Sequence, residues 1–251
     1  MIRTAVILAA GMGTRLAGEL DDRPKGFLRI GDRPIIEESI QRLADAGIRE
    51  VVIVTGHHAE FYESLDVGPE LSVQTINNPR YADSGSMYSL YCARQAVHDA
   101  FLLLESDLIY EPRALTELLE CSADDVILLS GPTGAGDEVF VSTRKGNLAG
   151  MSKDPDALGS DAEITGELVG ISKISGPLFR DMARIAELAF ADSLHFDYET
   201  DCLVAAATER RIACLLVPDL VWSEIDDPAH LKRARDTVYP EIQRRVNASG
   251  R

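Results

Sequence analysis

The chain has 251 residues, of which 45% are hydrophobic and 26% charged, as is typical of one soluble globular domain. Its formal net charge of −16 at pH 7 argues against a general nucleic-acid-binding protein, which needs a basic face, and against docking to an anionic membrane. No apolar run reaches the roughly 18 to 20 residues that span a bilayer. An acidic protein that binds phosphates must therefore gather its few basic residues locally or recruit divalent cations.

The cysteines and the first residues indicate the compartment. Cys92, Cys121, Cys202 and Cys214 form no Cys-x-x-Cys pair and lie in apolar or amphipathic runs, which predicts reduced, buried thiols rather than disulfides or a zinc site. The chain starts with a strand-like run that lacks the layout of a signal peptide. We therefore expect a cytoplasmic protein.

In the first half of the chain, apolar β-type runs alternate with helical patterns. The expected strands cover residues 4–10, 50–56, 71–78 and 100–107, and the expected helices cover residues 33–47, 57–65 and 86–97. This alternation predicts parallel strands with helices on both faces of the sheet. Ligands of such sheets bind at the carboxyl ends of the strands, which is where Gly11, Gly13 and Asp107 lie.

The second half of the chain contains a different mixture of elements. Strands are expected over residues 124–131, 167–175 and 211–218, and helices over residues 177–191, 196–210 and 227–246. Residues 137–153 have the pattern of a β-hairpin that turns at residues 145–147. We predict an α/β fold in one domain over residues 1–251. Its Rossmann-like sheet is mixed but mainly parallel, is flanked by helices, and carries the β-hairpin as an insertion in the second half.

Two glycines after the first expected strand suggest a phosphate-binding loop. Gly11 and Gly13 would let the backbone approach a ligand and present N–H groups to its oxygens. A dinucleotide-binding fingerprint needs a third glycine where Leu16 stands, and the Gly-Lys-Ser/Thr end of a P-loop is absent from this sequence. Taken alone, the glycines are equally consistent with a tight turn.

The longer string around these glycines is more specific. Leu8-Ala9-Ala10-Gly11-x-Gly13-Thr14-Arg15-Leu16, followed by Pro24-Lys25, resembles the signature of the sugar-phosphate nucleotidyltransferases and their relatives. The resemblance implies the fold of the nucleotide-diphospho-sugar transferases. It implies that Arg15 grips the leaving phosphates and that Lys25 reaches the α-phosphate or the phosphate of the acceptor, so both would be catalytic. The residues that would wrap the triphosphate are Leu8, Ala9, Ala10, Gly11, Met12, Gly13, Thr14 and Arg15.

Two distant aspartates are candidate magnesium ligands. Asp107 ends an expected strand, and Asp226 precedes the expected closing helix. Mg²⁺ takes a few carboxylates plus phosphate oxygens, and the resembled family places metal-binding aspartates at two matching positions. The alternatives are that Asp226 forms an N-cap pair with Asp227 at the closing helix and that Asp107 is a solvated loop residue. Glu105 and Glu224 are neighbours of this site.

Residues 85–89, Gly-Ser-Met-Tyr-Ser, correspond to a string that helps to hold the base in choline-phosphate cytidylyltransferases of the bacterial cell-surface type. In this chain, Gly85 stands where that string has asparagine. The resemblance implies that Ser86 and Ser89 hydrogen-bond a pyrimidine edge, which favours CTP. The alternative is that Ser86 is the N-cap of a core helix.

The acceptor pocket is indicated by Tyr198 and Glu199, which match in type an aromatic–acid pair of the choline-phosphate enzymes. Aromatic faces hold a quaternary amine, whereas carboxylates suit a primary amine. Val139 stands where the choline type has tryptophan, and only 6% of the residues are aromatic. Acidic side chains at Asp137, Glu138, Asp197 and Glu199 could therefore hold a small ammonium group, or they could be solvated. The acceptor residues that we expect are Lys25, Glu138, Tyr198 and Glu199.

These patterns predict a CTP-dependent cytidylyltransferase that requires Mg²⁺. It would transfer CMP to 2-aminoethylphosphonate, phosphocholine or a similar acceptor and release pyrophosphate, with residues 1–130 binding the nucleotide and residues 131–251 the acceptor. The alternatives are a nucleotidyltransferase for a sugar or inositol 1-phosphate and a catalytically inactive nucleotide-binding regulator. We expect no nucleic-acid or membrane partner. The sequence does not specify an oligomeric state.

Overall fold

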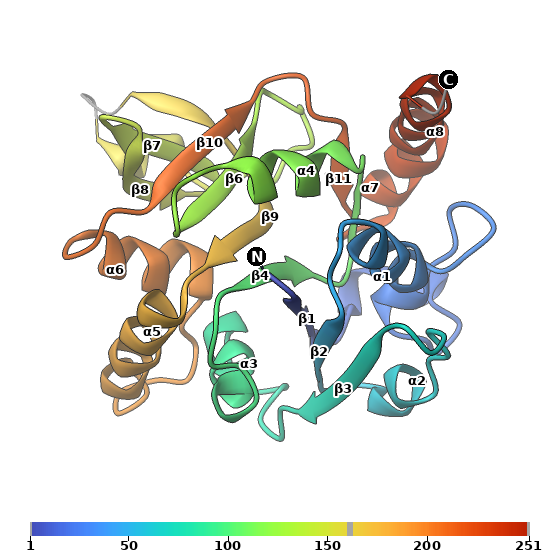
Figure 1. Ribbon diagram of the computed structural model, residues 1–251, viewed down its shortest axis with the longest axis horizontal. Coiled ribbons are helices and arrows are strands. Elements are labelled where there is room, and N and C mark those ends of the chain that lie inside the picture. The colour runs from blue at the N-terminus through green and yellow to red at the C-terminus, as the bar shows by residue number, and fades with distance from the viewer. Residues whose placement is uncertain (1, 160–162, 250–251) are drawn as a thin grey trace.

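A single large sheet runs through the protein, with helices packed on both of its faces (Figure 1). The computed structural model describes residues 2–159 and 163–249. Nine strands follow one another across the sheet in the order β3-β2-β1-β4-β9-β6-β10-β8-β7. This arrangement confirms the predicted α/β fold, in which a mixed sheet lies between layers of helices.

The first four strands of the chain pair in parallel. They are β1 (Thr4–Ala9), β2 (Glu50–Thr55), β3 (Ser72–Asn77) and β4 (Phe101–Glu105). Both faces of the central strands are covered, which is why β1 and β4 are continuous apolar runs rather than alternating ones. The connecting helices are α1 (Ile35–Asp45), α2 (Ala59–Glu63) and α3 (Ser86–Cys92). The carboxyl ends of these strands therefore lie together at one edge of the sheet.

Antiparallel strands enter the sheet in the second half of the chain. β9 (Ile164–Ile174) lies between β4 and β6 (Val126–Ser130) and runs against both, while β10 (Ala213–Val217) is parallel to β6. The predicted hairpin is present as β7 (Phe140–Arg144) and β8 (Asn147–Ser152), and it turns at Lys145 and Gly146, which both have positive φ. Among the described strands of this sheet, β8 and β9 run opposite to the others, so the sheet is mainly parallel, as predicted.

The core consists of two apolar layers, one on each face of the sheet. Ala5 and Ile7 of β1 face the layer that contains α1 and α4 (Arg113–Glu120), whereas Val6 and Leu8 face the opposite layer. That second layer contains α3, α5 (Gly176–Ala189) and α6 (Val204–Ala207). Successive side chains of a strand point to opposite faces, so one apolar run contributes to both layers.

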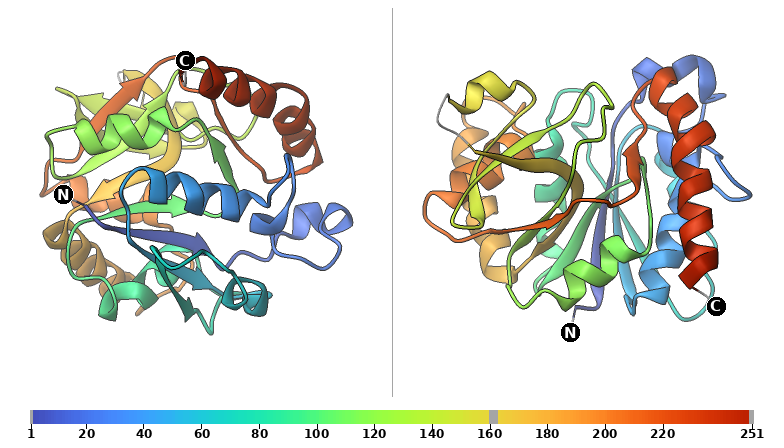
Figure 2. Two further views of the ribbon diagram at one scale, coloured as in Figure 1. Left: turned by 45° about the vertical axis from the view of Figure 1, so that its right-hand side comes forward. Right: turned by 90° about the horizontal axis from the view of Figure 1, so that it is seen from above.

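The closing helix lies beside α1 at the edge of the molecule (Figure 2). It consists of α7 (Pro228–Arg233), a π-helical stretch at Ala234–Val238 and α8 (Tyr239–Ser249). The regular helix predicted over residues 227–246 is therefore interrupted by a widened turn. A third apolar cluster, which includes Leu16, Ile225 and Ile242, packs this segment against the loop that follows β1. The packing brings residues near the end of the chain to the carboxyl edge of the sheet.

The cysteines are free thiols, as predicted, although they differ in burial. Cys202 is fully buried, and Cys92, Cys121 and Cys214 are partly exposed. Burial raises the pKa of Cys202 and that of Cys214 to about 12, so both thiols are protonated near neutral pH. Across residues 2–159 and 163–249, no helix has the length and apolar character needed to cross a membrane.

Candidate active site

The two glycines of the loop after β1, Gly11 and Gly13, have different structural roles. Gly13 has φ +62°, and a Cβ atom there would lie 3.0 Å from Leu20 Cδ1 and 3.1 Å from Lys25 Cγ. Both the backbone conformation and the close packing therefore require glycine at this position. A Cβ at Gly11 would meet no atom within 4 Å, and Gly11 is exposed. The loop thus packs at Gly13 and leaves open space at Gly11.

A cavity of about 330 Å³ opens above this loop. All eight residues of the predicted triphosphate loop, residues 8–15, line it, and so do Lys25, Ser86, Ser89 and Asp107. The predicted nucleotide-binding residues are therefore brought together, although they come from two separate segments of the chain, residues 8–15 and residues 86–89. Tyr62 and Tyr81 also line the cavity, and nothing in their sequence context had indicated it.

A small two-stranded sheet brings the two predicted metal ligands together. β5 (Leu108–Tyr110) pairs with β11 (Trp222–Glu224) in an antiparallel ladder that sets Leu108 opposite Glu224. Just beyond this ladder, the backbone N–H of Ile225 donates to the carbonyl of Asp107 at 3.1 Å. The carboxylates of Asp107 and Asp226 therefore converge although 119 residues separate them in the sequence.

Lys25 lies between these two carboxylates. Its Nζ atom is 2.9 Å from Oδ2 of Asp107 and is also bonded to Oδ1 of Asp226. The side chain is only 15% exposed, and burial alone would lower its pKa, but the charges of Asp107 and Asp226 outweigh burial and raise it. Arg15 binds the other oxygen of Asp226 at 2.6 Å while its side chain remains 57% exposed. Both predicted catalytic cations are thus ion-paired with one aspartate.

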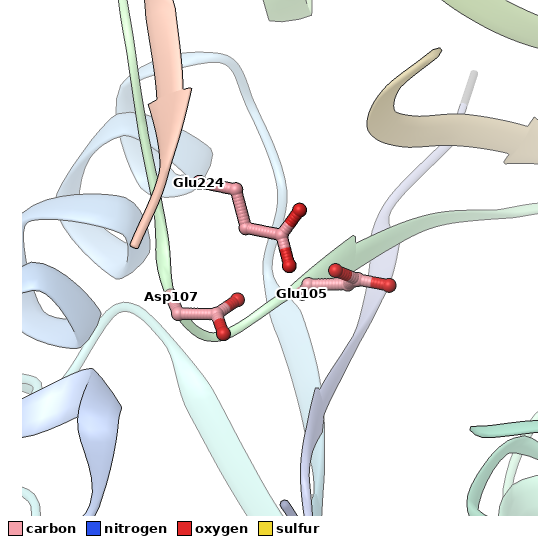
Figure 3. A group of neighbouring side chains, drawn as sticks. All are labelled: Glu105, Asp107 and Glu224. Atoms are coloured by element: carbon pink, nitrogen blue, oxygen red, sulfur yellow. The ribbon is translucent and has the colours of Figure 1, made fainter. Parts of the chain in front are cut away.

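Glutamates add further negative charge at this edge of the sheet. The carboxylates of Glu105, Asp107 and Glu224 face one another, and a carboxylate oxygen from each lies within 4.8 Å of the others (Figure 3). Asp137, Glu224 and Asp226 form a second such group. Burial, followed by the charges of Asp107 and Asp226, raises the pKa of Glu224 to about 9, and burial also raises the pKa of Glu105. Such crowding is relieved by protons or by a cation, so these oxygen donors fit a hard divalent ion.

A smaller pocket of about 60 Å³ adjoins the cavity, and Glu105 lines both. Glu138 and Glu199 line this pocket, as does Val139. The carboxylate of Glu138 is held by its own loop: burial would raise its pKa, but the backbone N–H groups of Gly136, Glu138 and Ala135 lower it. Tyr198 is not part of the pocket lining, because its buried side chain donates a hydrogen bond from Oη to Glu105 at 3.1 Å.

The two predicted base-binding serines have different partners. Ser89 is buried, and its hydroxyl accepts a hydrogen bond from Nδ2 of Asn78 at 3.0 Å. The hydroxyl of Ser86 contacts residues 197–199 instead of being an open group in the cavity. The structure also excludes the alternative role of Ser86, because the N-cap of α3 is Gly85. Of the alternative N-cap pair, Asp227 does cap α7 by accepting from the backbone N–H of His230, whereas Asp226 binds Lys25 and Arg15 instead.

Two residues of α7 hold the loop before β7 in place, a role that the sequence analysis does not predict. The buried His230 faces the carbonyl of Ala135 at 3.2 Å, and Arg233 donates to the carbonyl of Thr133 at 3.2 Å. These contacts span about 100 residues of sequence, and no local pattern could have indicated them. The helix that follows Asp226 therefore also fixes one wall of the smaller pocket.

The model of the MobA-like NTP transferase domain matches residues 5–161, which is more than half of the chain and includes the glycine loop, Lys25 and Asp107. The chain belongs to this family. Membership confirms the nucleotidyltransferase resemblance stated from the sequence.

Curated relatives of the chain include one protein named as a CMP-phosphonate synthase and two named as cytidylyltransferases. It is 29% identical over 245 residues to CMP-5'-(3-aminopropyl)phosphonate synthase of Streptomyces rubellomurinus, covering 92% of this chain and 38% of that protein. It is 28% identical over 198 residues to 2-aminoethylphosphonate cytidylyltransferase of Lancefieldella rimae, covering 76% and 74%. It is 30% identical over 107 residues to choline-phosphate cytidylyltransferase of Streptococcus pneumoniae, covering 43% and 46%. The chain thus spans less than half the length of the first and third of these relatives.

Among solved structures, the chain is similar to the inositol-1-phosphate CTP transferase from T. maritima. The TM-score is 0.80 at 19% identity, and the match covers 96% of this chain and 95% of that one. At this level of identity the likeness concerns the fold, and it confirms the fold predicted from the sequence.

Proposed function

We propose that the protein is a CTP-dependent cytidylyltransferase that transfers CMP to a small phosphonate or phosphorylated amino-alcohol and releases pyrophosphate. The observation that carries the proposal is the position of Lys25, between Asp107 and Asp226 in the cavity of the glycine loop. Relatives named for transfer of CMP or cytidylyl groups support CTP as the donor. The cytoplasmic location predicted from the sequence belongs to the same proposal.

In this proposal, residues 1–130 bind the nucleotide. The open backbone at Gly11 leaves room for the triphosphate, and residues 8–15 surround it. The exposed Arg15 can turn toward the leaving pyrophosphate. Ser89 lies on the same cavity wall and faces the base.

The reaction itself needs positioned charge more than a proton-transfer group. An oxygen of the acceptor phosphate or phosphonate, already negative near neutral pH, attacks the α-phosphorus in line. A new P–O bond forms as the bond from the α-phosphorus to the pyrophosphate oxygen breaks. Lys25 and Arg15 stabilise the charge that develops on the phosphates, once they exchange part of their pairing with Asp226 for phosphate oxygens.

The proposed divalent cation is Mg²⁺, and Asp107 and Asp226 would hold it, with Glu105 and Glu224 beside them. When bound, it would neutralise phosphate charge and orient the triphosphate. The carboxylates suit this purpose because their number exceeds that of the cations paired with them here. Replacement of Lys25 by a divalent ion between Asp107 and Asp226 would also free Lys25 for the substrate.

The second half of the chain, residues 131–251, would bind the acceptor in the smaller pocket. Five carboxylates line this pocket against two cationic side chains, Lys153 and Arg233. Trp222 is the one aromatic side chain among its described lining residues, and the volume is about 60 Å³. A small, acidic pocket suits a primary ammonium better than a trimethylammonium group, which needs several aromatic faces. We therefore favour 2-aminoethylphosphonate over phosphocholine. The lining acids are Glu105, Asp137, Glu138, Glu199 and Glu224.

The two alternatives have less support. A sugar or inositol 1-phosphate carries no positive charge to match the acidic pocket, although the fold itself would accommodate such an acceptor. A catalytically inactive regulator is disfavoured because Arg15, Lys25, Asp107 and Asp226 are all present and lie together.

The test is the release of pyrophosphate with CTP or UTP as donor, each combined with 2-aminoethylphosphonate, phosphocholine or glucose 1-phosphate in the presence of Mg²⁺. We expect the highest kcat/KM for CTP with 2-aminoethylphosphonate. A preference for glucose 1-phosphate would support the sugar alternative. Tight CTP binding without pyrophosphate release from any pair would support the inactive regulator.

A further inference from the structure

Two segments from opposite halves of the chain dock on each other between the cavity and the smaller pocket. The backbone N–H of Gly85 donates to the carbonyl of Leu194 at 2.8 Å, and that of Met87 donates to the carbonyl of Phe196 at 3.1 Å. A Cβ atom at Gly85 would lie 2.6 Å from the carbonyl oxygen of Phe196, so glycine permits this close approach. The start of α3 is thereby fixed against residues 194–199.

Ser86 lies at the centre of this contact. Its backbone N–H donates to Oδ1 of Asp197 at 3.0 Å, and its hydroxyl oxygen accepts from the backbone N–H of Tyr198 at 3.0 Å. The same hydroxyl is 3.1 Å from Oδ1 of Asp197 and 3.2 Å from Oε2 of Glu199. A hydroxyl has one hydrogen to donate. Because the backbone N–H of Ser86 already donates to Asp197, the hydroxyl hydrogen can be donated to Glu199.

The contact joins the two binding spaces. Ser86 lines the nucleotide cavity, and Glu199 lines the smaller pocket. A second bond supports the arrangement, since Tyr198 donates to Glu105, which lines both spaces. Residues 197–199 are therefore held by side chains of two residues, Ser86 and Glu105, that line the nucleotide cavity.

We propose that Ser86 is a positioning residue that orients Glu199 toward the acceptor and links nucleotide binding to acceptor binding. The inference rests on the proposed function, in which Glu199 binds the ammonium group of the acceptor. A nucleotide base beside the start of α3 restricts the motion of residues 84–89. It thereby restricts Glu199 through the Ser86 hydroxyl, so the acceptor binds more tightly after CTP than before it.

A double-mutant cycle tests this link, using Ser86→Ala, Glu199→Gln and the double variant in pyrophosphate-release assays with CTP and 2-aminoethylphosphonate. We expect Ser86→Ala to raise KM for the acceptor by about tenfold, the size typical of one hydrogen bond to a charged group. The double variant should be no worse than Glu199→Gln alone, because both changes remove the same interaction. Ser86→Thr keeps the hydroxyl and should restore the low KM.

The pH profile of kcat/KM for the acceptor distinguishes a positioning role of Ser86 from a purely structural one. The hydroxyl bond lowers the pKa of Glu199, so Ser86→Ala should shift the acidic limb of kcat/KM for the acceptor to higher pH. Ser193→Ala is the matched control, because the Ser193 hydroxyl accepts from the backbone N–H of His195 beside the same segment, and Ser193 lines neither the cavity nor the smaller pocket. In that control the acidic limb should stay in place. Folding of Ser86→Ala is checked by its unfolding midpoint, since the bond from the backbone N–H to Asp197 remains.

Different results would contradict the link between Ser86 and Glu199 and the proposed function. Additive effects of Ser86→Ala and Glu199→Gln in an active enzyme, or the same pH shift in Ser193→Ala, would overturn the link and leave the proposed function intact. A wild-type protein that binds CTP but releases no pyrophosphate with any acceptor would overturn the proposed function, and with it the role given to Glu199 and to this link.

Discussion

The Asp226 carboxylate is ion-paired with two cations, Lys25 on one oxygen and Arg15 on the other. Burial would raise its pKa, but the charge of Lys25, its hydrogen bond and the charge of Arg15 hold the pKa at about 2. The group is therefore ionised throughout the physiological range. Because it is also a proposed Mg²⁺ ligand, its charge should matter more for turnover than for folding.

Asp226→Asn should lower kcat by at least about 100-fold, because the amide removes a charge that organises both cations and the metal. Asp227→Asn is the matched control: the neighbouring carboxylate caps α7, and asparagine is an equally good N-cap. We expect the control to keep its turnover, and both variants to fold, as judged by thermal unfolding. Near-normal Mg²⁺-dependent activity in Asp226→Asn would contradict the assignment of this residue.

Glu199 should make both stability and acceptor binding depend on pH. Burial and the charge of Asp197 raise its pKa in the folded protein to about 7, against 4.5 as the ordinary value. The folded state therefore binds more protons than the unfolded state between these values, and the stability that Glu199 contributes is lost as pH rises from about 4.5 to 7. In Glu199→Gln, the fall of the urea midpoint over this range should be smaller than in the wild type.

Ionisation of Glu199, which lowers stability, should strengthen the binding of an acceptor that carries an ammonium group. Because the ionised carboxylate binds an ammonium group better than the neutral acid does, kcat/KM for 2-aminoethylphosphonate should rise as pH increases through about 7. Steady-state assays between pH 5.5 and pH 8.5, a range of roughly 1.5 pH units on either side, would measure this rise. A profile unchanged in Glu199→Gln would mean that another group causes it.

The docking of α3 on residues 194–199 depends on the glycine at the start of the helix. Gly85 has φ −78°, which any residue adopts, so a substitution there acts through space rather than through backbone strain. Gly85→Ala should destabilise the fold by about 1–3 kcal/mol and raise KM for the acceptor, because the added methyl group collides with the backbone of Phe196.

Gly18→Ala provides the comparison for this prediction. A Cβ at Gly18 would meet no atom within 4 Å, and its φ is not positive. We expect its unfolding free energy to stay within about 0.5 kcal/mol of the wild type. Equal unfolding free energies of Gly85→Ala and Gly18→Ala in urea would show that the start of α3 can move away from residues 194–199 without loss of stability.

Elements with a strong local pattern were predictable, and elements shaped by long-range contacts were less so. The apolar strands and the β7–β8 hairpin lie where the sequence predicts them. Strands buried on both faces require continuous apolar runs, and a hairpin requires turn residues, so both are visible in the local sequence. The helix expected over residues 196–210 begins instead with a π-helical stretch at Tyr198–Leu203. That stretch directly follows Asp197 and begins with Tyr198, which are bound to Ser86 and Glu105 from the other half of the chain.

The two halves of the molecule share one sheet. β9, from the second half, is inserted between β4 and β6 of the first half and pairs with both. β10, the other neighbour of β6, also belongs to the second half. A fragment of residues 1–130 would therefore leave β4 unpaired on one edge and β6 unpaired on both, and we expect it to lack a cooperative unfolding transition and to aggregate. Co-expression with residues 131–251 should restore soluble protein. Cooperative unfolding and CTP binding by the fragment alone would instead identify two independent domains.

The sequence by itself determined the fold class and the residue types of the site. Apolar periodicity predicts the alternation of strands and helices. The string from Leu8 to Leu16, with Lys25, indicates a nucleotidyltransferase, because a phosphate-binding loop is built from residues that are consecutive in the sequence. Only the tertiary structure decided the ladder that brings Asp107 near Asp226, the position of Lys25 between them, and the bond from Ser86 to residues 197–199. These contacts join segments that lie far apart in the chain, and the packing of β5 on β11 and of α3 on residues 194–199 creates them. No local pattern of residues encodes such a meeting, because it depends on the free energy of the whole fold.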